Sequence, residues 1–452
     1  MASTRQTVPL PALITFAVAL SVYAVTLAPG LTLAHYGGDG GELIAAAVTL
    51  GVPHPQGYPS YVLLGKLASL IPIGTVAYRF NLFSAVCIAG AAALLTQITR
   101  RESRSDIAAI ALGLTFAFAR LVWSQALIAE VYGLNLLVLA LLIWACQRRS
   151  SPLLLGLLWG FSLTTHLTSL LIFPFVLWAT QAKQPLRFAC GVALGLLPFG
   201  ALPFLASGDS AVVWSDPTTL QGWWWLVSGR IYRPNVFSHT PFPRLLTHGI
   251  AILRQFAFVG WIAVGYCFWR GDFRPKTLLY LSTALLYGVY AFSYDTVDFA
   301  VFALPALLLL SPLLATGYER LGAWSLAIPL LAIALSFNAV NLHDDTQTDV
   351  QARTLLGQMP ANAILLTPGD ETIFTLWYLQ EAETVRLDVT LVDQNLFAFN
   401  WYRDRLKALH PTLNALTVDD LDAFQHENKS FRPICTMSIT SNGTAVCSGI
   451  FQ

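Results

Sequence analysis

Residues 77–98 read AYRFNLFSAVCIAGAAALLTQI, an apolar run close to the roughly 20 residues that an α-helix needs to cross a bilayer. Similar runs recur between residues 11 and 340, and we expect about eleven membrane spans. The chain is 55% hydrophobic and only 11% charged, whereas soluble domains contain about 25% charged residues. We therefore expect a mainly α, polytopic membrane protein with spans at residues 11–29, 77–98, 106–124, 128–146, 152–165, 167–181, 187–206, 247–268, 277–293, 299–317 and 323–340.

The polar segments predict two domains. Residues 1–342 contain the apolar runs, interrupted by two long polar stretches at 30–76 and 207–246. From residue 343 the composition becomes polar for about 110 residues, which is enough for a small domain. Its runs AILLT and VTLV flank a helical pattern, which predicts a small α/β fold for residues 343–452.

The basic residues predict the orientation, because short loops rich in Lys and Arg stay in the cytoplasm. We expect an integral, multi-pass plasma-membrane protein with a cytoplasmic N-terminus and with both polar stretches and the C-terminal domain facing the periplasm or exterior. In that oxidising compartment Cys435 and Cys447 are expected to form a disulfide. The basic residues on the cytoplasmic side are Arg5, Arg100, Arg101, Arg104, Arg148, Arg149, Lys183, Arg187, Arg270, Arg274, Lys276 and Arg320.

Composition also excludes some partners. The net charge is +1, and no basic stripe with interleaved aromatic residues is present, so nucleic acid is not an expected partner. No CxxC pair or His-rich cluster predicts a structural zinc site.

The stretch GGDGGELIAAAVTLGVPHPQGYPS, residues 37–60, contains the main candidate site residues. Asp39 and Glu42 are three residues apart, so on a helix they share one face. The same spacing also fits a capping box, in which Asp39 caps a helix and Glu42 reaches back to it. The adjoining prolines fix a loop that offers His54 and Tyr58 as polar groups beside the membrane.

Further ionisable and aromatic residues fall at the outer ends of predicted spans. Each could be an ordinary polar group at a helix end, or, for an arginine, a side chain that reaches the interface. Charged groups cost about 2.5 to 3.5 kcal/mol at a span centre, so several retained near one face favour a binding site. Arginine also suits a phosphate, because its planar group donates two parallel hydrogen bonds. These candidates are Glu130, His166, Arg230, Tyr232, Tyr294 and Asp298.

Four segments resemble the transmembrane protein 260 family of O-mannosyltransferases and its bacterial relatives, within the GT-C glycosyltransferase superfamily. They are GDGGELIAAAVTLGVPHPQGYPSYVLL, EVYGLN, YDTVDFAVFALPA and ILLTPGDETIFTLWYLQEAETVRLDVTLVD. The bacterial relatives usually have Gly-Asp-Asn-Asp-Thr-Phe where this chain has Gly369 to Phe374, so the second acidic position differs. The resemblance implies a GT-C-type bundle whose essential acidic residue lies in the first outer loop, where this chain has Asp39.

The resemblance also implies the chemistry. A sugar, mannose in the family, would move from a polyprenyl-phosphate carrier to an acceptor hydroxyl on the outer face, with inversion. Asp39 would be the catalytic base, and Glu42 would either support the reacting groups from behind or orient the acceptor. His54 and Arg230 would contact the carrier phosphate. The remaining candidates would bind donor phosphate or acceptor: Tyr58, Glu130, His166, Tyr232, Tyr294 and Asp298.

The same resemblance predicts the cofactor requirement and the partners. We expect no cofactor and no required metal, although Asp39, Glu42 and Glu130 could hold a hard divalent cation. The partners would be the lipid-linked sugar donor, the bilayer, and either a protein Ser/Thr hydroxyl or an envelope glycan as acceptor. A transporter or flippase of a lipid-linked glycan is the alternative. Transporters usually bind substrate near the midplane, often between repeated halves, whereas these ionisable residues cluster at the outer ends without a visible repeat.

Overall fold

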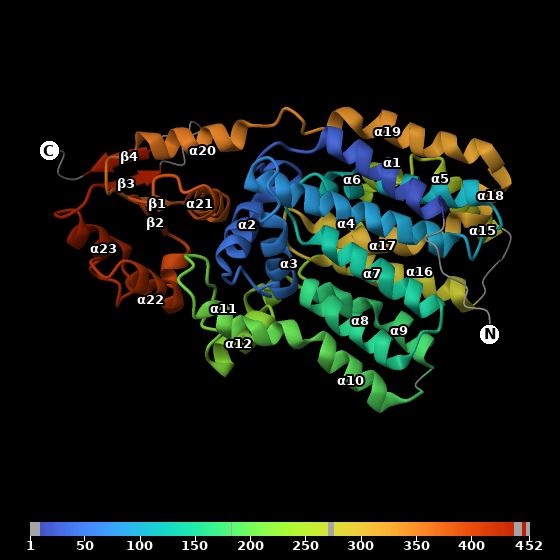
Figure 1. Ribbon diagram of the computed structural model, residues 1–452, viewed down its shortest axis with the longest axis horizontal. Helices are drawn as coiled ribbons and strands as arrows, with labels where there is room; N and C mark the ends of the chain where they lie inside the picture. Colours follow the sequence, from blue (N-terminus) through green and yellow to red (C-terminus); the bar gives the residue numbers. More distant parts are fainter. Residues whose placement is uncertain (1–9, 182, 270–274, 438–444, 449–452) are drawn as a thin grey trace.

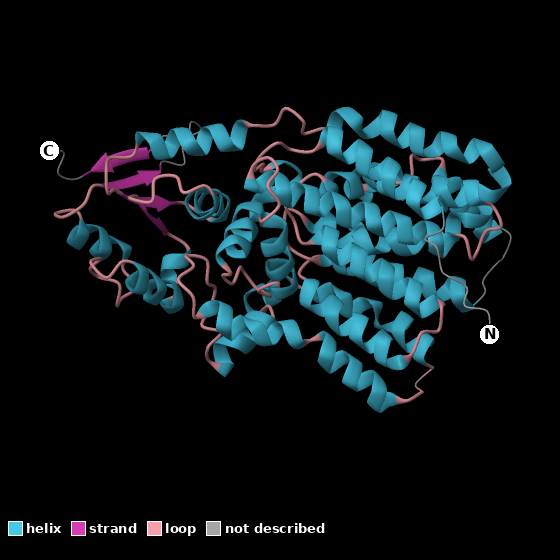
Figure 2. Ribbon diagram, viewed as in Figure 1, coloured by secondary structure: helices cyan, strands magenta, loops and turns pink. Residues whose placement is uncertain are grey.

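The computed structural model describes residues 10–181, 183–269, 275–437 and 445–448, which form a mainly helical molecule with one small sheet (Figures 1 and 2). The helical bundle and the sheet lie at opposite ends of the long axis, with the short helices α2 and α3 between them (Figure 1). Arg5, Arg270 and Arg274, which entered the orientation argument, are outside the described residues.

The bundle is built from helices between residues 10 and 340. Four further helices lie in the segments that connect them: α2 Gly40–Thr49, α3 Pro59–Ser69, α12 Leu220–Val227 and α13 Pro241–Thr247. The bundle helices are α1 Leu10–Thr26, α4 Val76–Thr99, α5 Asp106–Ala117, α6 Arg120–Ala126, α7 Tyr132–Gln147, α8 Pro152–Thr165, α9 Phe173–Thr180, α10 Pro185–Gly195, α11 Leu202–Ala206, α14 Gly249–Arg254, α15 Gly260–Trp269, α16 Pro275–Ser293, α17 Leu304–Leu310, α18 Ala315–Leu321 and α19 Ala327–Val340.

Three helical stretches among the described residues are long and apolar enough to cross a membrane: Val76–Thr99, Pro185–Ala206 and Phe299–Val340. A fourth is possible if α5 and α6, which meet at a bend of 69°, count as one span. Other predicted spans coincide with apolar helices of 10–17 residues, including Leu10–Thr26 and Tyr132–Gln147. The count of eleven therefore stays a prediction.

Two predicted spans contain a break in the structure, and the spans predicted at 299–317 and 323–340 lie in one helical stretch, Phe299–Val340. The span at 106–124 is bent between α5 and α6, and the span at 247–268 is interrupted after Arg254. At that interruption Ala257 and Phe258 have positive φ values of 51° and 59°, a left-handed conformation that an α-helix cannot contain. Hydropathy did not reveal the first break because Phe118 and Ala119 are apolar, and it did not reveal the second because Phe256 to Val259, which follow Gln255, are apolar as well.

Helix α4 fixes the start of the first polar stretch. The Thr75 hydroxyl caps the helix by accepting from the Tyr78 amide. One turn further on, the buried Asn81 side chain donates through Nδ2 to the carbonyl oxygens of Ala28 and Gly30, at 3.0 Å each. The segment that leads to Asp39 is thereby held at the N-terminal end of α4.

The C-terminal region contains a four-stranded sheet in the order β2-β1-β3-β4. Strand β1 pairs in parallel with β2 and β3, and β3 pairs antiparallel with β4. The strands expected from AILLT and VTLV are found as β1 and β2, and the helix expected between them is α21. The elements are α20 Gln347–Gln358, β1 Ile364–Thr367, α21 Asp370–Trp377, β2 Thr390–Asp393, α22 Asn400–Leu409, α23 Leu421–Asn428, β3 Ile434–Met437 and β4 Ala445–Ser448.

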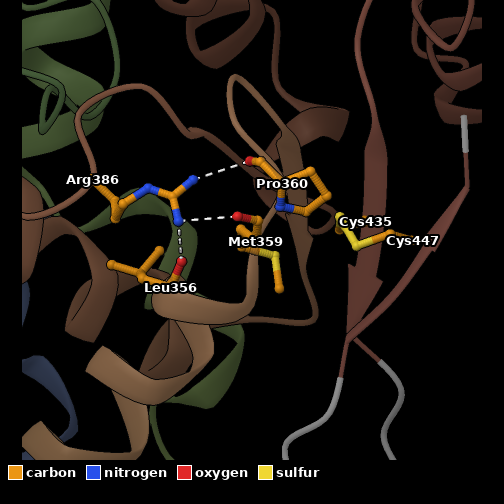
Figure 3. Close-up of a disulfide and its surroundings, with 6 residues drawn as sticks. All are labelled: Leu356, Met359, Pro360, Arg386, Cys435 and Cys447. Carbon is orange, nitrogen blue, oxygen red and sulfur yellow. Dashed lines mark hydrogen bonds between the residues drawn. A yellow bond between two sulfur atoms is a disulfide. The ribbon is translucent and has the colours of Figure 1, made fainter. Parts of the chain in front are cut away.

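A disulfide and a group of hydrogen bonds from one arginine stabilise this region (Figure 3). Cys435 and Cys447 form the expected disulfide across the β3–β4 pair. The Arg386 guanidinium donates to the carbonyl oxygens of Leu356, Met359 and Pro360, which closes the end of α20.

The C-terminal region shares its core with the bundle. One continuous cluster of buried apolar side chains extends from Tyr23 in α1 to Cys435 in β3. Helices α2 and α21 approach so closely that a Cβ on Gly41 would lie 2.3 Å from the Phe374 carbonyl oxygen. This contact places the start of α21 beside the first polar stretch, while the domain boundary at residue 343 stays a prediction.

Candidate functional site

Asp39 lies at the start of α2 and does not cap it. Its backbone occupies the N-cap position, but its side chain accepts no hydrogen bond from the first-turn amides. The carboxylate is 42% exposed and lines a cavity. The capping-box interpretation is therefore wrong. Both acidic side chains contact His54 instead of the backbone amides at the start of the helix.

Glu42 is fully buried behind Asp39 and accepts three hydrogen bonds. His54 provides two of them, from its backbone amide at 3.2 Å and from ring Nδ1 at 2.5 Å. The third comes from the indole Nε1 of Trp214. Glu42 thus holds the His54 ring from behind and has no surface through which to touch an acceptor. Of its two expected roles, this position fits the supporting group and not the group that orients the acceptor.

The His54 ring is held between two carboxylates. Nδ1 meets Glu42, and Nε2 lies 3.6 Å from Oδ2 of Asp39. Burial alone would lower the pKa of His54, but the charges of Asp39 and Glu42 outweigh it and raise that pKa to about 10. Burial also raises the pKa of Glu42, although the His54 charge opposes this. The ring is therefore an imidazolium at neutral pH.

A cavity of about 500 Å³ opens in front of Asp39 and His54. Its walls come from the first polar stretch, the start of η2 (Leu167–Ile172), the 3₁₀ helix η4 (Arg230–Asn235), the segment before α17 and the start of α21. Seven of the ten predicted site residues line it: Asp39, His54, Tyr58, His166, Tyr232, Tyr294 and Asp298.

Three predicted residues do not line the cavity. Glu42 lies behind His54, and Glu130 is 2% exposed with Oε2 accepting from the Val131 amide. Arg230 is exposed and absent from the cavity wall, whereas Arg233 is part of it. Gly229, with a φ of +58°, turns the chain just before Arg230. The position of this turn was not evident from the sequence SGRIYR.

His166 is a neutral wall residue. Its Nδ1 accepts from the Thr168 amide at 3.2 Å and lies 2.7 Å from the Thr168 hydroxyl. Burial lowers the pKa of His166 to about 4, and the nearby His54 charge acts in the same direction. The cavity therefore has one neutral and one charged histidine.

The C-terminal region provides wall residues that sequence reasoning did not assign to the site. Asp370 and Glu371, at the start of α21, line the cavity, and the Phe374 ring stacks on His54 at 6.5 Å. The motif from Gly369 to Phe374 was the available signal for them. For Trp214, no pattern in the sequence indicated a contact with Glu42.

A second, larger cavity of about 860 Å³ adjoins the first and shares Tyr36 with it. Its walls are mainly apolar side chains of α14, α16 and α17, such as Ile252, Leu285 and Leu307. Arg120 and Arg254 are among the few charged groups in its lining. An elongated apolar molecule with an anionic end would match this distribution.

Within the described ranges, no group of three or more His, Cys, Asp or Glu side chains is placed to hold a metal ion. The set of Asp39, Glu42 and Glu130, considered as possible cation ligands, does not form such a group. The expectation that the chemistry needs no metal stays a prediction.

Two families match the chain. Residues 39–187 match the Protein O-mannosyl-transferase TMEM260 N-terminal domain, and residues 348–430 match TMEM260-associated domain 2. The chain is 31% identical over 450 residues to Protein O-mannosyl-transferase TMEM260 of Mus musculus, covering 86% of this chain and 63% of the mouse protein. A Dictyostelium discoideum protein of the same description is 29% identical over 126 residues, covering 27% of this chain and 15% of that protein. The chain thus spans less than two thirds of the length of these relatives.

Solved structures share the fold. ArnT from Cupriavidus metallidurans aligns with a TM-score of 0.62 at 14% identity, in a crystal structure bound to undecaprenyl phosphate that covers 95% of this chain and 93% of ArnT. The apo crystal structure gives the same TM-score and identity, with 94% and 92% covered.

Proposed function

Because the chain belongs to the TMEM260 family, we propose that it is a membrane glycosyltransferase that moves a sugar from a polyprenyl-phosphate carrier to an acceptor hydroxyl. The names of the mouse and Dictyostelium relatives support mannose as the sugar and a protein Ser/Thr hydroxyl as the acceptor. The carrier is supported by the ArnT structure with bound undecaprenyl phosphate. An envelope glycan is the other acceptor to test.

The observation that carries the proposal is the pair of cavities, one apolar and one polar, that share the wall residue Tyr36. A polyprenyl-phosphate sugar is a long apolar chain with a charged phosphate and a polar sugar at one end. The 860 Å³ apolar cavity suits the chain, and the 500 Å³ cavity with Asp39 and His54 suits the polar end. The His54 imidazolium and the Arg233 guanidinium would neutralise the phosphate.

In the proposed reaction one proton is transferred, one C–O bond forms and one C–O bond breaks. The acceptor oxygen attacks the anomeric carbon, and its proton passes to the Asp39 carboxylate as the new C–O bond forms. The bond between the anomeric carbon and the phosphate oxygen breaks, and its electrons leave with the polyprenyl phosphate. Attack opposite the leaving group inverts the anomeric centre. Phosphate leaves readily, so one carboxylate base is sufficient.

The distribution of basic residues supports an extracytoplasmic site. Arg100, Arg101, Arg104 and Arg148 lie together at the C-terminal end of α4. The candidate site lies near the other end of α4, where Asn81 holds the segment before Asp39. Basic residues mark the cytoplasmic side, so the site and the C-terminal region would face outward.

Reconstituted protein with polyprenyl-phosphate [³H]mannose and a Ser/Thr-rich acceptor peptide tests the proposal. We expect the label to become covalently attached to the peptide, and envelope glycan in a parallel reaction tests the other acceptor. Labelled carrier that crosses the bilayer without covalent transfer to either acceptor would instead establish the flippase alternative.

A further inference from the structure

Trp214 belongs to the second polar stretch but is fastened to the first. The Val52 amide donates to the Val212 carbonyl at 2.8 Å, and the Trp214 amide donates to the Val52 carbonyl at 2.9 Å. The hydroxyls of Thr49 and Ser210 lie 2.6 Å apart and tie the same two segments together. The backbone of Trp214 is therefore bonded to Val52, which precedes His54 by two residues.

The Trp214 side chain is only 4% exposed and is absent from the walls of the cavity. Its indole N–H donates to Oε1 of Glu42, whose other oxygen contacts Nδ1 of His54. A continuous chain of contacts thus leads from Trp214 through Glu42 and His54 to Asp39. Trp214 can influence the reacting groups only through Glu42 or by ring contact.

We propose that Trp214 is a positioning residue whose indole N–H keeps the Glu42 carboxylate ionised and thereby keeps His54 charged and directed at the carrier phosphate. This inference rests on the proposed function only for the identity of the phosphate. The hydrogen-bonded chain itself can be tested without substrate.

The physical reason is the position of one shared proton. Glu42 is fully buried, and an unsolvated carboxylate is stable only if hydrogen-bond donors replace water. Removing the indole donor makes the ionised carboxylate less stable, so the proton between Glu42 and His54 shifts toward Glu42. His54 then becomes neutral and donates less strongly to an anion. The other titratable groups that face His54 stay in place: Asp39, Tyr58, Glu130, His166, Tyr232 and Asp370.

The neighbouring Trp401 offers a matched control. Its ring centroid lies 5.4 Å from that of Trp214, and its indole nitrogen is buried without a hydrogen-bond partner. Replacing either tryptophan by Phe keeps an aromatic ring in the same cluster and removes one N–H. Only Trp214→Phe removes an N–H that bonds Glu42.

The first measurement is donor kinetics. For Trp214→Phe we expect the KM for polyprenyl-phosphate mannose to rise about tenfold, the effect of losing one hydrogen bond to a charged group, with a smaller change in kcat. Trp401→Phe should match wild type. In a Glu42→Gln background Trp214→Phe should add almost nothing, because its effect passes through the carboxylate. Equal effects of the two Phe variants, or additive effects with Glu42→Gln, would overturn the inference.

The second measurement needs no turnover. The ¹⁵N shifts of labelled histidine, with His54 assigned by comparison with His54→Gln, should show both ring nitrogens protonated at pH 7 in wild type. One should be unprotonated in Trp214→Phe. If wild type transfers no sugar, the proposed function fails, and these shifts still decide the role of Trp214. An unchanged imidazolium in Trp214→Phe would refute that role.

Discussion

At the scale of single residues, Asp39 is the half-exposed carboxylate that faces the cavity without capping its helix. Asn has nearly the same size but can neither take a proton nor carry the negative charge that Asp39 places beside His54. We expect Asp39→Asn to fold and to bind donor, with Glu42 still beside His54, but to transfer sugar at least about a hundredfold more slowly, as expected for loss of a general base. Labelled transfer and donor binding measured on the same sample test this.

The matched control for Asp39→Asn is Asp106→Asn. Asp106 pairs with Arg100 on the exposed surface at the other end of α4 and should leave transfer unchanged. Near-normal transfer by Asp39→Asn would remove Asp39 from the role of base.

His54 makes the stability of the protein depend on pH. Its pKa is about 10 in the folded protein, above the ordinary value of 6.5, because Asp39 and Glu42 outweigh the effect of burial. A raised pKa means that the stabilisation is complete below about pH 6.5 and is lost as the pH rises towards 10. We expect the difference in melting temperature between wild type and His54→Gln to shrink over that interval. A difference independent of pH would show that the imidazolium does not form.

At the scale of helices and loops, some features could be predicted from the sequence and others could not. The apolar run at 77–98 and strands β1 and β2 were predicted correctly, because hydropathy and β-propensity are local properties. Strands β3 and β4 were not predicted. The break after Arg254 was missed because most of its residues, Phe256 to Val259, are as apolar as the helices on either side.

The residues of the candidate site also fall into those that could be predicted from the sequence and those that could not. Asp39 and His54 are close in sequence, and one Gly/Pro-rich loop brings them together. Glu42 was assigned a possible cap because the spacing of a capping box is the same whether or not a tertiary partner competes for the side chain. That partner, Trp214, is 172 residues away. Phe374, from the C-terminal region, likewise became part of the site only through folding.

The 3₁₀ helix η4 provides a direct comparison of two arginines. Arg233 lines the cavity, whereas Arg230 is exposed and outside it. We expect Arg233→Ala to weaken donor binding about tenfold, the order of one charged hydrogen bond, and Arg230→Ala to leave it unchanged. Arg233→Lys should recover only part of the loss, because Lys lacks the planar pair of donors. Titration of each variant with donor, judged by thermal shift, tests this. The reverse order would return the phosphate role to Arg230.

At the scale of the whole molecule, the C-terminal region contributes directly to the candidate site. Helix α21 provides Asp370 and Glu371 to the cavity, and Phe374 stacks on His54. Helix α22 acts from further away. Arg405 donates through Nε to the Ser210 carbonyl at 2.8 Å and through Nη2 to the Gly208 carbonyl at 2.6 Å. The segment that carries Trp214 is thus held from two sides, by Val52 and by Arg405.

The last prediction follows from this second attachment. In Arg405→Ala the segment 208–214 loses its hydrogen bonds from the Arg405 guanidinium and is held less firmly on the side of α22, so the indole of Trp214 should spend less time on Glu42. We expect a several-fold loss of transfer with a raised donor KM, and faster hydrogen exchange at the amides of Val52 and Trp214, whose bonds join the two segments. Kinetics and exchange mass spectrometry on one preparation provide both values.

Arg386→Ala is the control, because Arg386, like Arg405, donates to backbone carbonyl oxygens, but its three acceptors all lie within the C-terminal region (Figure 3). It should lower the stability of that region and leave exchange at Val52 unchanged. If Arg405→Ala alters transfer no more than Arg386→Ala does, the C-terminal region acts on the reaction only as a wall of the cavity. If the effect of Arg405→Ala disappears in the Trp214→Phe background, the attachment acts through the indole, and the two ends of the molecule are coupled at His54.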